Sequence, residues 1–453
     1  SSVRTDTRSS LASVIATTSL GFVLVQLDVS IVNLALARMG NALGASVSGL
    51  QWIADAYTIA FASLLLTAGS AGDRFGQRRV FEAGFALFAL ASLGCGFAPG
   101  LVSLIAARVL EGAGAALLVP CSLALLRHET GGNAAARVRA IALWTAAGSA
   151  ALAAGPIVGG VLVQSVGWRA IFLVNVPLGA VGICCARRFL TETTPEPTGF
   201  DAAGQALAFL TLLSLVGAAI EAGPLGPAHP LVLSGFMLAA VGAGAFLRVE
   251  RRAARPFLPP GFFRHASFRG CSLIGLVVNA ALYGALFVIG LCLQRVFSFS
   301  PSEAGLALLP FAIALGLGNL AAARLAGRYG APATMAAGLL LGAAGFWLLR
   351  GASGAEAYTA LLPGLIAIPA GIGLVVPLMT SVLLASVSPG RAGVAAGVLN
   401  TVRQAGGSLG IASAGSFFAA AGMNGMRATF AGFAALLAMA SLFAFFGLSA
   451  EES

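Results

Sequence analysis

The chain has 453 residues, of which 58% are hydrophobic and only 9% are charged. A soluble globular domain carries nearer a quarter charged residues, so this composition excludes an ordinary soluble protein and predicts an all-α polytopic membrane protein. The formal net charge of +10 comes from Arg alone, because the chain contains no Lys. Most of these Arg residues lie between apolar segments, where they orient helices in a membrane rather than bind nucleic acid.

Apolar segments long enough to cross a bilayer, about 17–25 residues each, recur along the whole chain. We predict fourteen spans, at 11–36, 47–70, 80–97, 101–126, 137–163, 168–189, 203–222, 230–249, 268–294, 303–324, 332–350, 355–384, 393–420 and 427–448. Arg residues concentrate after the even-numbered spans, which places those loops and both termini in the cytoplasm. Abundant Ala and Gly beside the lack of Lys suggest a bacterial coding sequence, so we expect a bacterial cytoplasmic (inner) membrane.

Two long polar linkers divide the chain. They bracket the seventh and eighth spans and predict a polar tail at 1–10, a six-helix bundle at 11–189, a linker unit with two helices at 190–267, a second six-helix bundle at 268–448 and a tail at 449–453. The sequence of the turn after the second span is weakly similar to Ala321–Gly330, which ends the second span of the last six. A shared feature at the same place in both parts indicates duplicated bundles.

The fifth span is built mostly from Gly and Ala. On a helix, Gly148, Ala151, Gly155 and Gly159 form one narrow stripe without large side chains, which lets a neighbouring helix approach closely. Pro156 removes a backbone donor and predicts a kink near Leu152. Together with Gly160, these residues suggest a contact that can slide or tilt. The simpler alternative is ordinary tight packing.

A short turn between the second and third spans carries the pattern Gly69-Ser-Ala-Gly-Asp-Arg-Phe-Gly-Gln-Arg-Arg79. Its Gly residues allow a tight path, and its acid can accept backbone N–H groups or pair with an Arg. Its Arg residues can dock on helix C-termini or on lipid headgroups. The conformational motif comprises Gly69, Gly72, Asp73, Arg74, Gly76, Arg78 and Arg79. The alternative is a loop whose charges only set orientation.

Ionisable residues inside apolar spans are functional candidates, because an isolated charge at mid-membrane costs about 2.5–3.5 kcal/mol on insertion scales. Asp28 lies in the first span, Arg108 and Glu111 in the fourth, and Arg403 in the thirteenth. A spacing of three lets Arg108 and Glu111 pair on one helix face. Burial disfavours the ionised form of a carboxyl group and a nearby Arg favours it, so such a pair can exchange protons as its solvent access changes. The alternative is a fixed ion pair.

Other polar residues have weaker signals. We expect Asp55 and Glu82 to lie at the membrane interface. Asp28, Glu111 and Arg403 are also candidates for binding a cargo molecule, together with Asn33, Trp144, Asn279, Tyr283, Asn400 and Gln404. Asn175 is a further residue able to line a polar cavity, although each of these alone is more often a packing or interhelical contact. The six Cys and three His show no spacing that suits a metal, so we expect no metal and no cofactor.

At these motifs the chain resembles the major facilitator superfamily, in its fourteen-helix drug:proton antiporter branch of methylenomycin-resistance-type exporters. The resemblance rests on Gly69–Arg79, on Arg108 with Gly112, on the fifth-span glycines, on Leu27–Asn33 and on Gly167–Gly179. It implies alternating access, with Asp28 as a proton or substrate site, Arg108 aiding proton handling and the fifth-span face as a mobile contact.

The chain departs from that branch at two points. Glu111 stands where Gln is more usual, and an extra acid there would carry a second proton or read a cationic cargo. No clear acid lies deep in the ninth or tenth span, which argues against broad export of dications.

We therefore expect a proton-coupled efflux transporter, not an enzyme, that exports a small amphipathic compound such as an antibiotic. Its expected partners are this cargo, protons and the lipid bilayer, its energy source is the proton gradient, and we expect a monomer. The alternatives are a proton-coupled symporter or importer on the same fold, and a non-transporting membrane receptor. A membrane-embedded enzyme finds no support, since no Cys/His or Ser/His/Asp constellation is present.

Overall fold

The computed structural model describes residues 11–131, 134–195, 202–252, 260–352, 357–387 and 392–449. Within these ranges the chain is helical and forms no strand. The helices are α1 (Leu11–Leu43), α2 (Val47–Phe75), α3 (Gln77–Gly96), α4 (Leu101–Thr130), α5 (Ala134–Ser165), α6 (Ala170–Leu173), α7 (Asn175–Phe189), α8 (Ala202–Leu225), α9 (Pro230–Arg252), α10 (Ala266–Arg295), α11 (Pro301–Ala307), α12 (Leu309–Tyr329), α13 (Ala331–Ala352), α14 (Leu362–Ala385) and α15 (Ala392–Ser449). The predicted tail at 1–10 lies outside the described residues.

The described helices account for fourteen membrane crossings. Twelve are long and apolar enough to span a bilayer, and α2, which bends by 52° between Leu65 and Thr67, makes a thirteenth. One of the twelve, the 53 residues Ala395–Gly447, would extend about 80 Å as a straight helix, more than twice the roughly 30 Å hydrocarbon layer. It folds back at Gly422, whose φ of 53° and ψ of −126° are not helical, and so crosses twice.

Two predicted single spans are each divided in two. The sixth span breaks at Val174 between α6 and α7, and the tenth breaks at Leu308 between α11 and α12. A Pro follows each break within three residues, at Pro177 and Pro310, and the fixed φ of Pro suits the first turn of a new helix. Each pair still forms one apolar span, Ala170–Phe189 and Pro301–Tyr329, as predicted.

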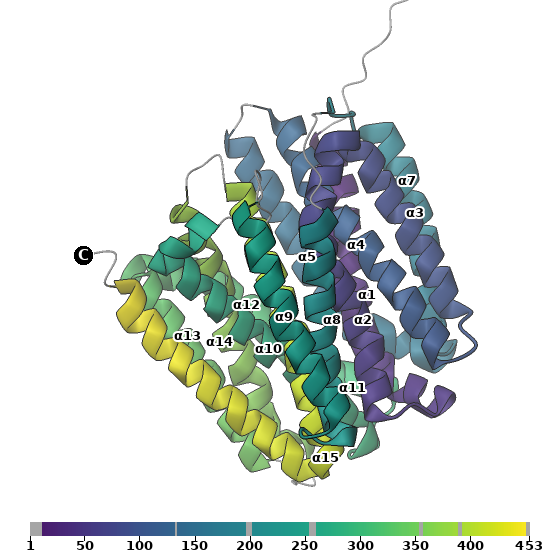
Figure 1. Ribbon diagram of the computed structural model, residues 1–453, viewed down its shortest axis with the longest axis vertical. Coiled ribbons are helices and arrows are strands. Elements are labelled where there is room, and N and C mark those ends of the chain that lie inside the picture. The colour runs from purple at the N-terminus through teal and green to yellow at the C-terminus, as the bar shows by residue number, and fades with distance from the viewer. Residues whose placement is uncertain are drawn as a thin grey trace, which may run out of the picture.

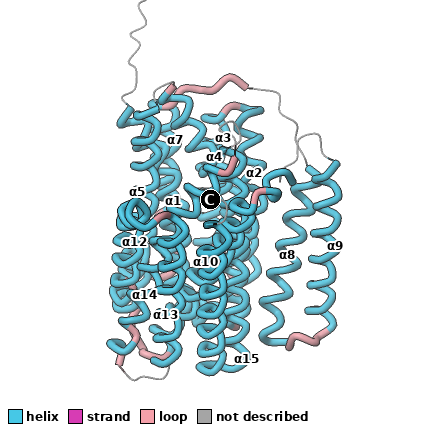
Figure 2. The backbone as a smooth tube through the Cα atoms, turned by 90° about the vertical axis from the view of Figure 1, so that its left-hand side faces the viewer, coloured by secondary structure: helices cyan, strands magenta, loops and turns pink. Residues whose placement is uncertain are grey.

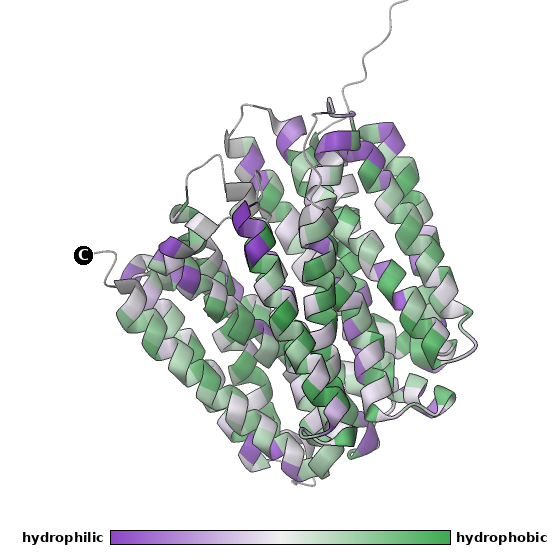
Figure 3. Cartoon of the chain, in the orientation of Figure 1, coloured by the Kyte–Doolittle hydropathy of each residue, from purple (hydrophilic) through white to green (hydrophobic). Residues whose placement is uncertain are grey.

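The helices lie in two groups (Figure 1). The N-terminal helices α1 to α7, drawn in purple to blue, face the C-terminal helices α10 to α15, drawn in green to yellow. Contacts of α1 with α10, α2 with α15 and α5 with α11 join the groups. The mid-portions of the helices are mainly hydrophobic and many hydrophilic segments gather near their ends, as a membrane-spanning bundle requires (Figure 3).

The two ends of the helices differ in charge. One end carries the α2–α3 turn with Arg78 and Arg79, together with Arg187 and Arg188 at the end of α7, and we call it the arginine-rich end. The opposite end, where α1 leads into α2, is the arginine-poor end. The division into two six-helix bundles and a two-helix linker unit stays a prediction.

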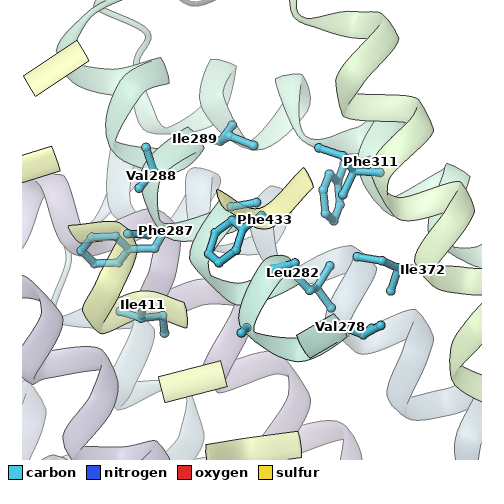
Figure 4. Packing of buried hydrophobic residues seen from close by; sticks show 14 of the residues in the cluster. Val278, Leu282, Phe287, Val288, Ile289, Phe311, Ile372, Ile411 and Phe433 are labelled. Carbon is cyan, nitrogen blue, oxygen red and sulfur yellow. The ribbon is translucent and has the colours of Figure 1, made fainter. Parts of the chain in front are cut away.

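Hydrophobic burial joins the two groups mainly toward the arginine-poor end. One core cluster combines α1 from Ile31 to Met39 and α2 from Leu50 to Ala54 with much of α10, α14 and α15. Part of it, around Leu282, Phe287 and Phe433, is drawn in Figure 4. A second cluster holds α1 from Val14 to Val25 and α2 from Tyr57 to Ala68 with N-terminal helices only.

Polar and backbone contacts reinforce this junction. Gln51 Nε2 of α2 donates to the carbonyl oxygens of Ile411 (3.1 Å) and Ala412 (2.6 Å) of α15. On the other side, a Cβ atom added to Gly160 of α5 would lie 2.7 Å from the carbonyl oxygen of Pro301 in α11. We call the contacts of α2 with α15 and of α5 with α11 the seam.

Helices α8 and α9 stand at one edge of the molecule (Figure 2). Helix α8 is tied to the seam, since Trp52 Nε1 of α2 donates to Glu221 Oε1 of α8 at 2.9 Å and Ser416 Oγ of α15 donates to the carbonyl oxygens of Ala219 and Ile220. Helix α8 therefore packs against both groups, and α9 packs against α8.

Helices α2 and α4 approach each other closely at Gly112. A Cβ atom on Gly112 of α4 would lie 2.2 Å from the carbonyl oxygen of Tyr57, which is part of a helix and cannot rotate away. Gly112→Ala should therefore lower the free energy of unfolding by about 1–3 kcal/mol, the usual effect of overpacking. Thermal unfolding in detergent measures it. Gly244→Ala in α9, where a Cβ meets nothing within 4 Å, is the control and should be neutral or stabilising.

Candidate functional site

A buried charge cluster lies inside the N-terminal group. Arg108 of α4 contacts Asp28 Oδ2 of α1 at 2.6 Å and Glu111 Oε2 at 2.7 Å, both through Nη1. The side chains of all three residues are at most 1% exposed. One cation thus stands between two acids, where desolvation makes every charge interaction stronger than in water.

Hydrogen-bond donors from two further helices surround the acids. Ser92 of α3 donates to Glu111 Oε1, and Cys95 Sγ donates to Glu111 Oε2 at 3.5 Å. Asn175 Nδ2 of α7 lies 3.3 Å from Asp28 Oδ1, 3.2 Å from Ser92 Oγ and 3.5 Å from Glu111 Oε1. Most remaining acceptor sites of the two carboxylates are thereby satisfied, as a buried polar network requires.

Aromatic rings and backbone hold the guanidinium in place. Its central carbon lies 4.3 Å from the ring centre of Tyr57 in α2 and 5.9 Å from that of Phe172 in α6. Arg108 Nε donates to the carbonyl oxygen of Ile53 at 3.2 Å. Five helices and the short α6 therefore meet around the charge cluster, so a rearrangement of any of them changes the surroundings of Asp28 and Glu111.

The small-residue stripe of α5 lies against α1. Added Cβ atoms would lie 2.0 Å from the ring of Phe22 at Gly148, 2.4 Å from Ser30 at Gly155 and 3.0 Å from Ile31 at Gly159. The close approach predicted from the glycine spacing is present, and the α5 stripe touches the helix that carries Asp28.

Pro156 leaves a carbonyl group without its helical donor, and α1 supplies a substitute. In a regular helix the amide of residue 156 would donate to the carbonyl of Leu152, but Pro has no N–H. Ser30 Oγ donates to that carbonyl oxygen at 2.8 Å. The hydroxyl therefore links α1 to α5 at the point where α5 is weakest.

Cavities lie between α1, α5, α10, α12 and α15. One of about 190 Å³ is lined mainly by apolar side chains, with Ser30, Ser149, Tyr283 and Asn319 as polar groups. A second, of about 20 Å³, is bordered by Arg108, Asn33, Tyr57, Tyr283 and Gln404. The smaller cavity has room for about one water molecule and connects the charge cluster to the C-terminal group.

The residues predicted to bind cargo are dispersed. Tyr283 borders both cavities, and Asn33 and Gln404 border the smaller one. Asn279 donates to the carbonyl oxygen of Gly275 in its own helix, whereas Trp144 donates to Ser122 Oγ and stacks on Phe22, which is a packing arrangement. Asn400 is half-buried in α15, and Arg403 beside it has a buried Nε without a hydrogen-bond partner.

The start of α3, just after the α2–α3 turn, is capped by a different acid from the one predicted. Gly76 has a φ of 95°, a conformation that favours Gly. Asp73 Oδ1 accepts from the Gln77 side chain at 2.8 Å, whereas the backbone N–H groups of Arg78 and Arg79 donate to Glu192, which follows α7. The acid at the start of α3 was expected from the turn itself, but a distant residue supplies it.

The Arg residues of this turn have separate contacts. Arg78 Nη1 donates to the carbonyl oxygen of Leu190 at the end of α7, which agrees with docking on a helix C-terminus. Arg74 lies over the ring of Phe75, at 5.3 Å. Gly69 has no atom near an added Cβ, whereas a Cβ on Gly72 would meet the Gln77 side chain.

Comparison with known proteins decides the family. The model of the Major Facilitator Superfamily matches residues 18–411 and 271–453. The chain belongs to the Major Facilitator Superfamily. Its helical architecture agrees with the crystal structure of the human organic anion transporter MFSD10, which superposes with a TM-score of 0.64 at 18% identity over 96% of this chain and 99% of that one.

Curated relatives narrow the type of major facilitator. The chain is 36% identical to the methylenomycin A resistance protein of Streptomyces coelicolor over 87% of this chain and 83% of that protein. It is 35% identical to the tetracenomycin C resistance and export protein of Streptomyces glaucescens over 88% and 74%, and 32% identical to the multidrug efflux pump LfrA of Mycolicibacterium smegmatis over 93% and 83%. The chain is thus a multi-pass membrane transporter of the drug efflux type rather than an enzyme.

Several residues of the charge cluster were not predicted from the sequence. Ser92, Cys95 and Tyr57 are ordinary in apolar spans and contact the charged groups only because α2, α3 and α4 cross there. A helical-wheel alignment of α3 offers a signal, since Ser92 and Cys95 lie three residues apart and share one face.

Removing the cation should leave two uncompensated acids. Arg108→Gln is expected to lower the free energy of unfolding by about 3–5 kcal/mol, because a broken buried ion pair leaves unpaired charge. Adding Asp28→Asn and Glu111→Gln should recover much of that loss. Denaturant titration in detergent measures both, and a single variant as stable as wild type would contradict the expectation.

The Ser30 contact can be tested by a double-mutant cycle. Ser30→Ala leaves the Leu152 carbonyl oxygen without a hydrogen-bond donor and should lower the free energy of unfolding by about 1–3 kcal/mol. Pro156→Ala restores the helical N–H, so in that background the Ser30→Ala change should be nearly neutral. Equal effects of Ser30→Ala in both backgrounds, measured by thermal unfolding, would show that the hydroxyl does not replace the missing donor.

Proposed function

We propose that this major facilitator exports a small amphipathic compound, such as an antibiotic, in exchange for protons. The arginine-rich end would face the cytoplasm of a bacterium, following the distribution of Arg between the loops. The observation that carries the proposal is the cluster in which Arg108 stands between Asp28 and Glu111.

The charge balance of this cluster suits proton exchange. With both acids ionised it carries one net negative charge, and one bound proton makes it neutral. In a fully buried site the neutral form is favoured, whereas access to water favours loss of the proton. Opening of the bundle toward one membrane face would therefore release the proton on that side, which links protonation to conformation.

The position of the cluster links it to the moving parts. Asp28 lies on α1 two residues before Ser30, which packs against the α5 stripe. A shift of α5 along its small residues changes the packing of α1 and hence the environment of Asp28. We propose that this contact transmits the state of the acids to the seam, where α5 meets α11.

The larger cavity suits the proposed cargo. Its volume of about 190 Å³ and its mainly apolar lining favour a compact hydrophobic body, and Ser149, Tyr283 and Asn319 offer hydrogen bonds. We propose that cargo binds between α5, α10 and α12, with Asn33 and Gln404 reached through the smaller cavity. The relatives that confer antibiotic resistance support a cargo of this class.

The same proposal covers the remaining partners. Protons and the small compound are the only ligands it requires, so the transporter would work as a monomer driven by the proton gradient without a cofactor. Asn279, Asn400 and Arg403 would shape the cargo path from α10 and α15, whereas Trp144 would hold α5 against α1 and α4.

Replacing Asp28 tests the coupling. Asp28→Asn should abolish proton-coupled transport while leaving the protein folded, because Asn keeps the shape but cannot exchange a proton. Transport of a cargo identified in a resistance panel, run with and without a protonophore, is measured in proteoliposomes with an imposed pH gradient. Glu111→Gln should weaken or abolish coupling in the same assay.

The control is Glu82→Gln, because Glu82 pairs with Arg78 and Arg187 at the arginine-rich end, away from the cluster. This variant should keep coupled transport. Full coupling in Asp28→Asn would remove Asp28 from the mechanism, and proton movement in the same direction as the cargo would indicate a symporter instead.

A further inference from the structure

One acid of the seam has no role in the mechanism above. Asp55 of α2 is 0% exposed, and neither of its carboxyl oxygens has a hydrogen-bond partner in the structure. The expectation that Asp55 lies near the membrane interface stays a prediction, but its side chain is covered by protein. It lies two turns into α2, where that helix packs against α15.

The partner helix offers a hydroxyl group but no cation. Ser408 of α15 faces Asp55, and its oxygen also lacks a geometrically well-formed hydrogen bond. One turn toward the arginine-poor end, Gln51 bonds to the backbone of α15 and closes the contact. The acid is therefore enclosed between two helices that belong to different groups.

Charged groups on the helices around α2 do not pair with Asp55. On α4, Arg108 is bound to Glu111 and to Asp28 of α1, and on α8 Glu221 accepts from Trp52. On α15, Arg403 packs its side chain near Gly275 of α10. Among the described residues none of these groups forms an ion pair or hydrogen bond with Asp55.

An ionised carboxylate enclosed in this way, with a single hydroxyl nearby and no cation, is unfavourable, and such a group takes up a proton instead. The neutral carboxyl has an O–H that can donate to Ser408, which would satisfy both polar groups at once. The geometry thus favours a protonated Asp55 while the seam is closed.

We propose that Asp55 is a second proton site that controls the seam. When α2 and α15 separate, water reaches the carboxyl group and the proton leaves to that water. When the seam closes, a proton from the same side must first bind. The proton enters and leaves on one side, so Asp55 adds no charge to the transport stoichiometry and instead sets how readily the seam opens. The assignment of that side to the cell exterior rests on the proposed function.

Linkage gives the direction and size of the effect. The closed seam binds one more proton than the open seam, so rising pH favours opening, by up to tenfold in the opening equilibrium per pH unit. Low external pH would hold the seam shut in the state that is ready to receive cargo from the cytoplasm.

The test follows the seam directly. Spin labels at Asn41→Cys in α1 and Asn424→Cys in α15, both exposed at the arginine-poor end, report the separation of the groups when the exposed Cys184 and its neighbour Cys185 are replaced by Ala. With rising pH the distance distribution of the purified transporter should gain a longer component. Asp55→Asn, which imitates the protonated acid, should remove that pH response and keep the short distance.

A matched variant separates titration from packing. Gln51→Leu removes a seam hydrogen bond without removing a titratable group, so it should favour the longer distance at every pH while keeping the pH response. In Asp55→Asn, an infrared band of a protonated carboxyl group seen at neutral pH in the wild type should disappear.

Two results would overturn the proposal: an unchanged pH response in Asp55→Asn, or no loss of that infrared band. If Asp55→Asn does not fold, Asp55→Ser takes its place with the same expectations. Neither measurement needs cargo or a proton gradient. Loss of coupling in Asp28→Asn and loss of the seam response in Asp55→Asn are therefore separate outcomes.

Discussion

The N-terminal group depends on one guanidinium group held out of water. Arg108 binds two acids from two helices, stacks near two aromatic rings and donates to the backbone of a third helix. A charge in this position is tolerated only while all its partners stay in place. Helices α1, α2, α3, α4 and α7 are consequently positioned by polar contacts, whereas the C-terminal group is held mainly by apolar packing.

Small residues determine how closely the helices approach. Gly112 brings α4 onto the backbone of α2, and Gly155 and Gly159 bring α5 onto α1. In a membrane the hydrophobic effect between helices is weak, so packing at short range carries much of the stability. The same close contacts that stabilise the bundle set the geometry of the charge cluster, because they lie on the helices that supply its members.

The sequence allowed the class of fold, the number of crossings and the pairing of Arg108 with Glu111 to be predicted, since each follows from local spacing or from hydropathy. Asp28 was predicted to be a site residue from the family resemblance and from the rule that buried charges need partners. Ser92, Cys95 and Tyr57 could not be predicted, because their contacts depend on where helices cross. The enclosure of Asp55 could not be predicted for a related reason, because position along one helix says nothing about a second helix that covers it.

The small cavity beside Arg108 has a bearing on ion selectivity. Its volume of about 20 Å³ accommodates about one water molecule. A single water can relay a hydrogen ion by exchanging hydrogen bonds, whereas sodium would have to lose its hydration shell beside the guanidinium of Arg108. Discrimination between the two ions would then follow from the cost of dehydrating sodium next to a positive charge.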